Sequence, residues 1–397
     1  MKKVTIILIV IIAMTIKTNA QWVAQTSGIS LALFSVYFTN SNTGYTVGMN
    51  GTILKTTNAG NNWIALQTSG TTSHLSSVYF ADANNGCAVG GTGTIIITQN
   101  AGNSWTVRTG GGGEQLYSVF LTNPNTGYAV GGSGGISNGL IISSSNFWGA
   151  IGGQYNTLCS IYFTDVNTGY AVGYDGTILK STDAGSSWTS QTSGTTNILY
   201  SVYFTNANIG YAVGQNGTIL KTTDAGNSWI TQSSGTANKL SSVYFINANT
   251  GYAVGNYGTI LKTTNGGTIW TAQSSGTTSG LASVYFTSSN IGYIVGGNGT
   301  ILKTTNGGVG ISELSNEENN ISVFPNPAND NITIENTSLN NYKDEMISIY
   351  NIQGQLLIQQ PMIQTKINID ISDFTRGMYY LKVQTENGIA VKKFIKE

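Results

Sequence analysis

The chain has 397 residues, of which only 9% are charged, and its formal net charge at pH 7 is zero. No basic patch of the kind that nucleic acids require is present, so nucleic-acid binding is not expected. The 51 glycines, with few prolines and many Ser, Thr, Asn and Tyr residues, favour short strands joined by tight turns and disfavour a helical protein.

The first twenty residues are typical of a secretory signal peptide. Two lysines precede an apolar run from Val4 to Ile16, which is too short to span a bilayer comfortably, and Ala20 offers a small residue for cleavage. We therefore expect residues 1–20 to be removed and the mature chain to begin at Gln21. No later segment is apolar enough to cross a membrane, so no transmembrane segment is expected in the mature chain.

A repeat of about 41 residues then fills residues 21–311. Each unit has four strand signals, for example Leu199–Phe204 (LYSVYF), Gly210–Gly214 (GYAVG), Gly217–Thr223 (GTILKTT) and a segment that begins at a tryptophan. The tryptophans keep the period throughout and are Trp22, Trp63, Trp105, Trp148, Trp188, Trp229 and Trp270. Seven units of four short strands predict an all-β fold, a seven-bladed β-propeller.

The two ends of this repeat region complement each other. The last unit has Ile311 where a tryptophan should stand, so it lacks its fourth strand, while the mature chain begins with an isolated fourth strand at Trp22–Gln25. We expect these two fragments to form one blade, because a closed ring leaves no exposed sheet edges.

The segments between the third and fourth strands carry a recurrent motif. They read TTNAGNNW (56–63), STDAGSSW (181–188), TTDAGNSW (222–229) and TTNGGTIW (263–270), and they resemble the Asp-box motif S/T-x-D/N-x-G-x-x-W. With GYAVG and GTILKTT, the whole unit resembles the photosystem II assembly and stability factor family of seven-bladed propellers. The resemblance implies this fold and an assembly-factor-like scaffold, although fold alone does not carry function.

Each residue of the motif has a physical reason. Asp or Asn accepts hydrogen bonds from nearby backbone amides, Gly supplies a positive φ angle, and Trp buries a large ring. We therefore expect structural roles for Asn58, Trp63, Asn100, Trp105, Asp183, Trp188, Asp224, Trp229, Asn265 and Trp270. The lysines that recur at one position of the unit (55, 180, 221, 262 and 303) are interpreted as surface residues beside this turn.

Residues 321–397 form a different region. SVFPNPANDNITI (322–334), ISIYNIQGQLL (347–357) and the segment from Phe374 to Glu397 resemble a type A C-terminal sorting domain of the type IX secretion system. Their alternating apolar residues predict a small β-sandwich. The resemblance implies that this machinery is a partner and delivers the protein beyond the outer membrane of a Gram-negative bacterium. It also implies removal of the domain, and the polar residues 312–320 are the expected linker for cleavage.

Catalytic chemistry has few candidates. Sialidases with Asp-box motifs use three arginines, whereas residues 21–311 contain only Arg108. Glycanases need paired carboxylates, and only Glu114 and Asp175 are expected on the face where propellers usually bind ligands. One histidine and two separated cysteines, Cys87 and Cys159, form no metal-ligand cluster. We expect no metal or cofactor, and two free, buried thiols.

The function favoured by these observations is an exported, non-catalytic propeller that binds protein or glycan. A glycan-active hydrolase and an assembly-factor-like scaffold remain the alternatives. Ligands of propellers usually meet the loops between the second and third strands and between blades, and here those loops carry Asn and Tyr residues that suit recognition. The candidate binding residues are Tyr174, Asp175, Tyr257, Asn216, Asn256 and Glu114.

Overall fold

The computed structural model describes residues 22–66, 69–135, 138–144, 149–151, 155–308, 321–336, 346–352, 355–385 and 388–397. The chain divides into two compact units, Met1–Gly310 and Ile311–Glu397. The expected signal peptide and linker, and also Trp148 and Ile311, lie outside the described residues. Within the described ranges, no helix is long and apolar enough to span a membrane.

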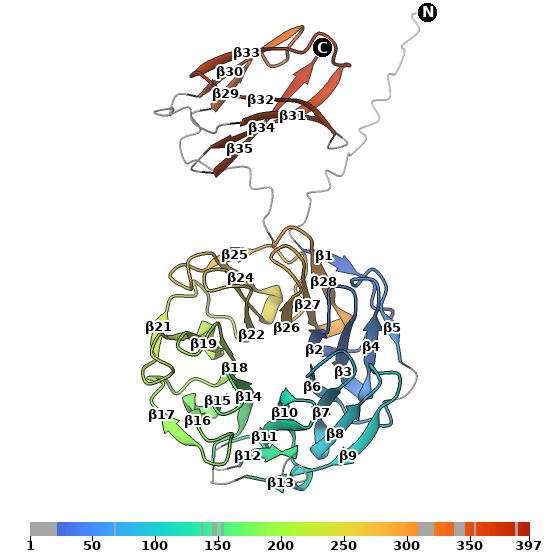
Figure 1. Ribbon diagram of the computed structural model, residues 1–397, viewed down its shortest axis with the longest axis vertical. Coiled ribbons are helices and arrows are strands. Elements are labelled where there is room, and N and C mark those ends of the chain that lie inside the picture. Colours follow the sequence, from blue (N-terminus) through green and yellow to red (C-terminus); the bar gives the residue numbers. More distant parts are fainter. Residues whose placement is uncertain are drawn as a thin grey trace, which may run out of the picture. The chain divides into compact units, whose positions relative to one another are not determined.

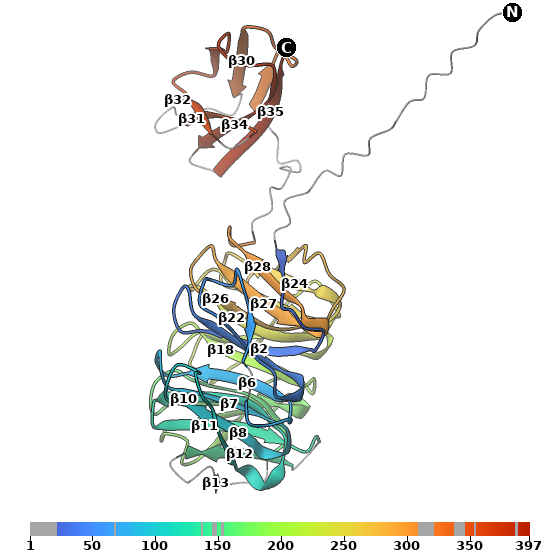
Figure 2. The ribbon, with the colours of Figure 1, turned by 90° about the vertical axis from the view of Figure 1, so that its right-hand side faces the viewer.

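The first unit is a ring of seven four-stranded antiparallel sheets, shown along its axis in Figure 1 and from the side in Figure 2. In six of these sheets, or blades, the strands follow chain order from the central channel outwards, and in the seventh the outermost strand comes from the N-terminal end of the repeat region. Blade 1 contains β2 (Leu33–Phe38), β3 (Gly44–Gly48), β4 (Ile53–Thr56) and β5 (Ile64–Ala65); blade 2 contains β6 (Leu75–Phe80), β7 (Gly86–Gly90), β8 (Thr94–Thr98) and β9 (Thr106–Thr109); blade 3 contains β10 (Leu116–Asn123), β11 (Thr126–Gly132), β12 (Gly139–Ser143) and β13 (Gly149–Ala150); blade 4 contains β14 (Leu158–Phe163), β15 (Gly169–Gly173), β16 (Ile178–Ser181) and β17 (Thr189–Gln191).

Three further blades complete the ring. Blade 5 contains β18 (Leu199–Phe204), β19 (Gly210–Gly214), β20 (Ile219–Thr222) and β21 (Ile230–Gln232); blade 6 contains β22 (Leu240–Phe245), β23 (Gly251–Gly255), β24 (Ile260–Thr263) and β25 (Thr271–Gln273); blade 7 contains β26 (Leu281–Phe286), β27 (Gly292–Gly296), β28 (Ile301–Thr304) and β1 (Val23–Gln25). The predicted seven-bladed propeller is therefore confirmed.

Blade 7 joins the two ends of the repeat region. Strand β1 pairs antiparallel with β28, and Val23 lies opposite Lys303. Trp22 is buried and meets Phe286 edge-on at 5.8 Å between ring centroids, much as Trp63 meets Phe38 at 5.9 Å in blade 1. The predicted closure of the ring by an isolated N-terminal strand is thus confirmed.

Packing between neighbouring blades explains the repeated residues. Second strands such as β3 and β19 are buried along their whole length, because a blade covers each of their faces. Phe80 of blade 2 stacks on Tyr45 of blade 1 at 4.3 Å. A Cβ at Gly86 would lie 2.6 Å from the ring of Phe80, so the glycine at the start of the second strand makes room for the phenylalanine of the strand beside it. Blade 3 has Leu121 in place of that phenylalanine.

The second unit contains two sheets that enclose one core. Strands β29 (Ile321–Phe324), β30 (Asn331–Asn336) and β33 (Lys366–Asp370) form the smaller sheet, and β32 (Leu356–Pro361), β31 (Met346–Asn351), β34 (Gly377–Thr385) and β35 (Gly388–Lys396) form the larger one. Buried residues of both sheets meet in this core. The predicted small β-sandwich is therefore confirmed.

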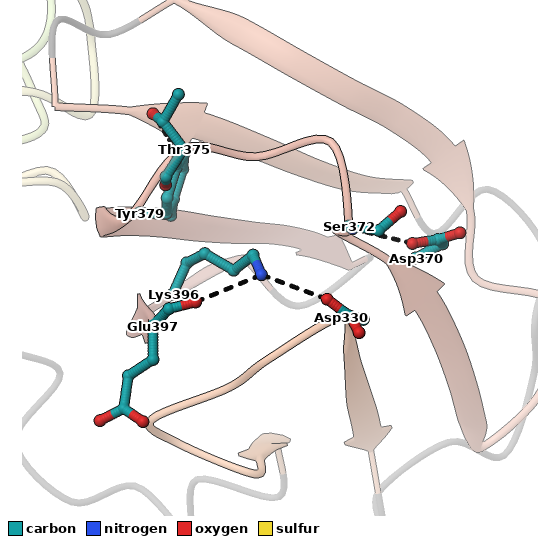
Figure 3. Close-up of polar contacts among 7 residues, drawn as sticks. All are labelled: Asp330, Asp370, Ser372, Thr375, Tyr379, Lys396 and Glu397. Atoms are coloured by element: carbon teal, nitrogen blue, oxygen red, sulfur yellow. Dashed lines mark hydrogen bonds and ion pairs between the residues drawn. The ribbon is translucent and has the colours of Figure 1, made fainter.

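Polar contacts hold the last strand of this sandwich in place (Figure 3). The nearly buried Lys396 has its Nζ 3.4 Å from a carboxylate oxygen of Asp330. The Tyr379 hydroxyl donates to the carbonyl of Thr375 at 2.6 Å. These contacts tie β35 and β34 to the loops beside them, so the end of the chain is an integral part of the domain.

Candidate functional site

The innermost strand of every blade contains a β-bulge at the same place. In blade 1, Leu33 pairs with Gly48 but Ser35 pairs with Val47, so Phe34 is the extra residue of the bulge. A bulge turns its residue away from the regular alternation and is often used to aim a side chain at a site. The seven bulge residues are Phe34, Ser76, Tyr117, Cys159, Tyr200, Ser241 and Ala282.

The residues around each bulge have structural duties. A Cβ at Gly90 would lie 1.8 Å from the carbonyl oxygen of His74, so only glycine lets the strands approach there. The Ser35 hydroxyl accepts a hydrogen bond at 3.2 Å from the backbone N–H of Val78 in the next blade. The equivalent bond recurs at all seven blade junctions. The fold thus requires the glycine and the serine, but leaves the bulge residue free to vary.

All seven bulge residues line one cavity of about 520 Å³, here called the channel mouth. Residues from the segments that precede the innermost strands and from the 3-10 turns between the second and third strands complete its wall. The larger of these further residues are His74, Gln115, Tyr174, Lys239 and Asn256. Among the residues that line the channel mouth there is no carboxylate.

The channel mouth is asymmetric. Its bulky side comes from Tyr117, Cys159 and Tyr200, with Tyr174 beside them, whereas the bulge residues of blades 6 and 7 are only a serine and an alanine. The Nζ of Lys239 lies 4.5 Å from the ring centroid of Tyr200. Burial raises the pKa of Tyr117 and Tyr200 and lowers that of Lys239. Burial also raises the pKa of Cys159 to about 12, so this thiol stays protonated at neutral pH and is a poor nucleophile.

A ring of aromatic side chains lies three residues further along the same strands. Neighbouring ring centroids are 4.6 to 5.3 Å apart around the whole circle. Tyr37 donates its hydroxyl hydrogen to the carbonyl of Phe80 in the next blade at 2.9 Å, and burial raises the pKa of Tyr162 and Tyr244 to about 12. These tyrosines stay protonated as donors between blades. The ring members are Tyr37, Tyr79, Phe120, Tyr162, Tyr203, Tyr244 and Tyr285.

The candidate binding residues from the sequence occupy several places. Tyr174 and Asn256 line the channel mouth. Asp175, Asn216 and Tyr257 are the exposed middle residues of the 3-10 turns η5 (Tyr174–Gly176), η6 (Gln215–Gly217) and η7 (Asn256–Gly258), with φ angles of 52°, 54° and 56°. Glu114 is half-buried outside the cavity, and its carbonyl accepts the N–H of Gly93 at 2.6 Å.

Sequence reasoning missed the bulge residues. Phe34, Tyr117, Cys159 and Tyr200 stand at the variable position of the LxSVYF motif, whose neighbours hardly change between blades. That contrast is the signal that could have found them. Cys159 also differs from the expectation in its burial: both cysteines are free as expected, but Cys159 is half-buried because the bulge turns it toward the channel mouth.

The turns between the third and fourth strands, called outer turns here, lie away from the channel mouth. Asp183 accepts hydrogen bonds from the Ser187 hydroxyl (2.6 Å), the Ser187 N–H (2.9 Å) and the Ser181 hydroxyl (2.8 Å). The Ser187 hydroxyl contributes most to holding its pKa at about 2. Asn58 accepts the N–H of Asn62 in the same way at 3.0 Å. These carboxylates and amides shape a turn. A carboxyl group with a pKa of about 2 is ionised at neutral pH and has no proton to give as a general acid.

Other members of the outer turns make equivalent contacts. Asp224 accepts from Ser228, and its pKa is also held at about 2. The backbone N–H groups of Ser104 and Ile269 donate to the amide oxygens of Asn100 and Asn265. The tryptophans pack against neighbouring rings and are buried except Trp105, which is half-buried. These tryptophans are Trp63, Trp105, Trp188, Trp229 and Trp270.

The recurrent lysines of blades 1, 4, 5, 6 and 7 each clamp their blade to the next. Tyr45 Oη and Lys55 Nζ both donate to the carbonyl of Ala101 in the outer turn of blade 2, each at 2.7 Å. The same Tyr/Lys clamp recurs from blades 4, 5, 6 and 7. The lysines therefore lie beside the outer turns, as expected, and also bind them.

Blade 2 lacks both donors of the clamp. Cys87 and Ile97 stand opposite each other where other blades have tyrosine and lysine. The sequence of blade 3 lacks the motif that would supply the acceptor and reads SSSNFW at 143–148. Cys87 is fully buried among apolar side chains, and burial raises its pKa. Cys87 thus fills space at a blade junction where the sequence replaces both parts of the clamp.

Hollows elsewhere on the ring are features of the repeat. Three equivalent grooves lie beside the 3-10 turns of blades 1, 4 and 7, and Asp175 lines the one on blade 4. In the parts of the chain that the structure describes, no group of three His, Cys, Asp or Glu residues could hold a metal ion. The channel mouth differs from these repeated grooves, because the side chains that line it are not the same in every blade.

A comparison with protein families decides the relationship of the chain. The model of the photosynthesis system II assembly factor YCF48 matches residues 14–106, 142–231 and 186–277, more than half of the chain. The chain belongs to this family. Residues 322–397 match the secretion system C-terminal sorting domain, so the second unit is a type IX sorting domain and marks the protein for export.

Solved structures show the same fold. YCF48 from Cyanidioschyzon merolae is 17% identical, with a TM-score of 0.60 over 71% of this chain and 98% of that one. YCF48 bound to D1 peptide is 18% identical, with a TM-score of 0.61 over 72% and 97%. The WD40 repeats of RRP9 are 10% identical, with a TM-score of 0.59 over 72% and 97%. The chain matches none of the curated proteins with which it was compared.

Proposed function

We propose that this chain is an exported, non-catalytic propeller that binds a segment of another protein at the channel mouth. One observation carries the proposal. The seven bulge residues are of five different types, whereas the leucine before them and the serine after them repeat, and all seven bulge residues line one cavity. The serine after the bulge and the glycine opposite the leucine, which the fold needs there, are repeated in every blade. The variation at the bulges is therefore not explained by folding, and recognition explains it.

The chemistry of the channel mouth supports binding rather than catalysis. Its polar groups are hydroxyls, amides, an imidazole, a lysine and a protonated thiol. A glycosidase needs two carboxylates facing one another, whereas Glu114 and Asp175 lie outside this cavity. Asp183 and Asp224 belong to the outer turns, where hydrogen bonds keep them ionised.

A polypeptide ligand fits the size and lining of the site. The cavity volume lies within the usual range of ligand pockets. Tyrosine and phenylalanine on rigid strands offer planar contact area at low entropic cost. A related propeller of known structure is described as YCF48 bound to D1 peptide, which supports a peptide ligand in general but not that peptide. A glycan stacked on the tyrosines is the second candidate.

Export places this activity outside the cell. The sorting domain marks the chain for type IX secretion, and we propose that the propeller acts at the cell surface or in the medium after the domain has been removed. A photosynthetic client inside a cell would not meet such a protein.

The test compares variants of the exported protein. Partners from the cell surface and medium are captured with the wild-type chain and identified, and glycans are screened in parallel on an array. Affinity for the identified ligand is then measured for Tyr117→Ala/Tyr200→Ala and for Tyr257→Ala. Tyr257 is the matched control because it lies in a 3-10 turn outside the cavity and is 74% exposed.

We expect the double variant to lose at least about tenfold in affinity, as for aromatic anchors of other interfaces, and the control to stay near wild type. Loss in the control but not in the double variant would refute the channel mouth as the site. If the identified ligand is a glycan whose binding depends on Tyr117, a glycan replaces the polypeptide in the proposal.

A further inference from the structure

Lys239 stands out among the lysines of the propeller. It precedes β22, is half-buried, and its Nζ lies over the ring of Tyr200 at the channel mouth. The other lysines of the ring donate to backbone carbonyls of a neighbouring blade. Within the described residues, the ammonium group of Lys239 has neither a carboxylate nor a hydrogen-bond acceptor.

The surroundings of Lys239 do not supply a negative charge. No aspartate or glutamate lines the channel mouth among the described residues. The nearby polar groups include the hydroxyls of Tyr117, Tyr174 and Tyr200, which can donate hydrogen bonds. The channel mouth is therefore rich in donors and contains one cation without a counter-charge.

Such a lysine carries an energetic cost in the free protein. Partial burial removes water from the ammonium group and lowers the pKa of Lys239, and the aromatic ring beneath it offsets only part of that loss. An anion that enters the cavity would restore the lost solvation with a charge-assisted hydrogen bond. We therefore expect the ligand to present a negatively charged group to Lys239.

We propose that the channel mouth holds a carboxylate of the bound peptide against Lys239, with an adjoining apolar or aromatic residue packed on Tyr117 and Tyr200. This inference rests on the proposed function, which names a polypeptide as the ligand. The carboxylate is either the peptide's C-terminus or an Asp or Glu side chain, and both present the same chemistry to a lysine.

A peptide array tests the inference. Each random peptide is made as the free acid, as the C-terminal amide, and with every Asp and Glu changed to Asn and Gln. The array is probed with the full chain as wild type, Lys239→Met, Lys239→Arg and Tyr117→Ala. Lys239→Met keeps the aliphatic stem while it removes the charge, and Lys239→Arg restores the charge.

The expected pattern is a coupled loss. Removing the carboxylate from a bound peptide should weaken binding to the wild type by about tenfold to a hundredfold, as for hydrogen bonds to charged groups. Lys239→Met should cause a similar loss, and the two changes together should cost no more than either alone. Lys239→Arg should retain most of the affinity. The set of altered peptides that loses binding shows whether the carboxylate comes from the C-terminus or from a side chain.

Two other outcomes would overturn the claims separately. Binding that requires Tyr117 but is indifferent to the carboxylate or to Lys239→Met refutes this inference and leaves the proposed function standing. An array without any binding that depends on Tyr117 refutes the polypeptide ligand and this inference with it. A thermal melt of Lys239→Met serves as the folding control, and we expect it to melt at or slightly above the wild-type temperature, because the substitution removes a partly desolvated charge that has no partner in the described residues.

Discussion

Asp183 and Asp224 are ionised carboxylates whose oxygens shape outer turns, and Asn58, Asn100 and Asn265 hold the same position in other blades. Their assignment to turns could be predicted from the sequence, because the motif combines a residue that bonds backbone amides with a glycine. The bulge residues could not be assigned in the same way. LxSVYF appears as one continuous strand, and the bulge becomes evident only from the pairing of each leucine with the close-packed glycine of the next strand.

The two outer-turn aspartates should make stability fall in acid. Their pKa in the folded protein is about 2, below the ordinary 3.8, so their contribution is present above pH 3.8 and is lost as the pH falls through 2. We expect the melting temperature of Asp183→Asn/Asp224→Asn to drop less than that of wild type between these values. Asp175→Asn, in an exposed 3-10 turn, is the control. Parallel acid profiles of wild type and the double variant would disprove the assignment.

The Tyr/Lys clamp gives a second prediction for single residues. Lys221→Met removes the ammonium that binds the Gly266 carbonyl, and we expect about 1 kcal/mol less free energy of unfolding in denaturant titration. The matched variant is Ile97→Lys, which adds a lysine at the junction where the next blade lacks the motif for an acceptor. It should give no stabilisation. A gain in stability from Ile97→Lys would show that an acceptor exists there.

Secondary-structure elements are specified mainly by the repeat. The period and the four strand signals of each unit predict every blade. The isolated strand at Trp22–Gln25 predicts the closure of the ring, because this strand and the incomplete last unit each have an unpaired edge, and pairing with one another covers both edges. The 3-10 turns follow from Asn-Gly and Asp-Gly pairs, which tolerate positive φ. Thr92 and Tyr257 adopt the same conformation without such a preference, which no local signal predicts. Of the residues that line the channel mouth, the sequence predicted Tyr174 and Asn256.

Removing the closing strand tests this account of the ring. Deletion of residues 22–25 leaves the edge of β28 unpaired and removes the buried Trp22, so we expect a strong fall in melting temperature. Trp22→Ala alone should cost about 3–5 kcal/mol, as for other buried aromatic residues. The ring would still be joined by the hydrogen bond from Tyr285 to Phe38. A truncated protein that melts like wild type would show that β1 is dispensable.

The whole molecule combines a binding scaffold with a domain that directs its export. Both folds were predictable from sequence, since each has its own periodic pattern. The proposed binding site was not, because its seven bulge residues lie about 41 residues apart in the sequence and only ring closure brings them together. The sorting domain contains a core of its own. Loss of that domain therefore need not disturb the propeller.

Processing of the exported protein follows from this organisation. We expect the secreted form to begin at Gln21 and to lack the region after about Glu313, because residues 1–20 resemble a signal peptide and residues 312–320 form a polar linker. Intact mass spectrometry of protein from the culture medium and cell surface measures both ends. A secreted species that retains residues 322–397 would disprove removal of the sorting domain.

Site-specific photo-crosslinking tests the central claim most directly. A photoreactive phenylalanine analogue replaces Tyr117 at the channel mouth, Tyr257 outside the cavity, or Asn61 in an outer turn, and the exported protein is irradiated among its natural neighbours. If the channel mouth is the binding site, the Tyr117 position should yield a discrete crosslink to one partner, and the other two positions should yield none above background. A crosslink to that partner from Asn61, with none from Tyr117, would contradict the account.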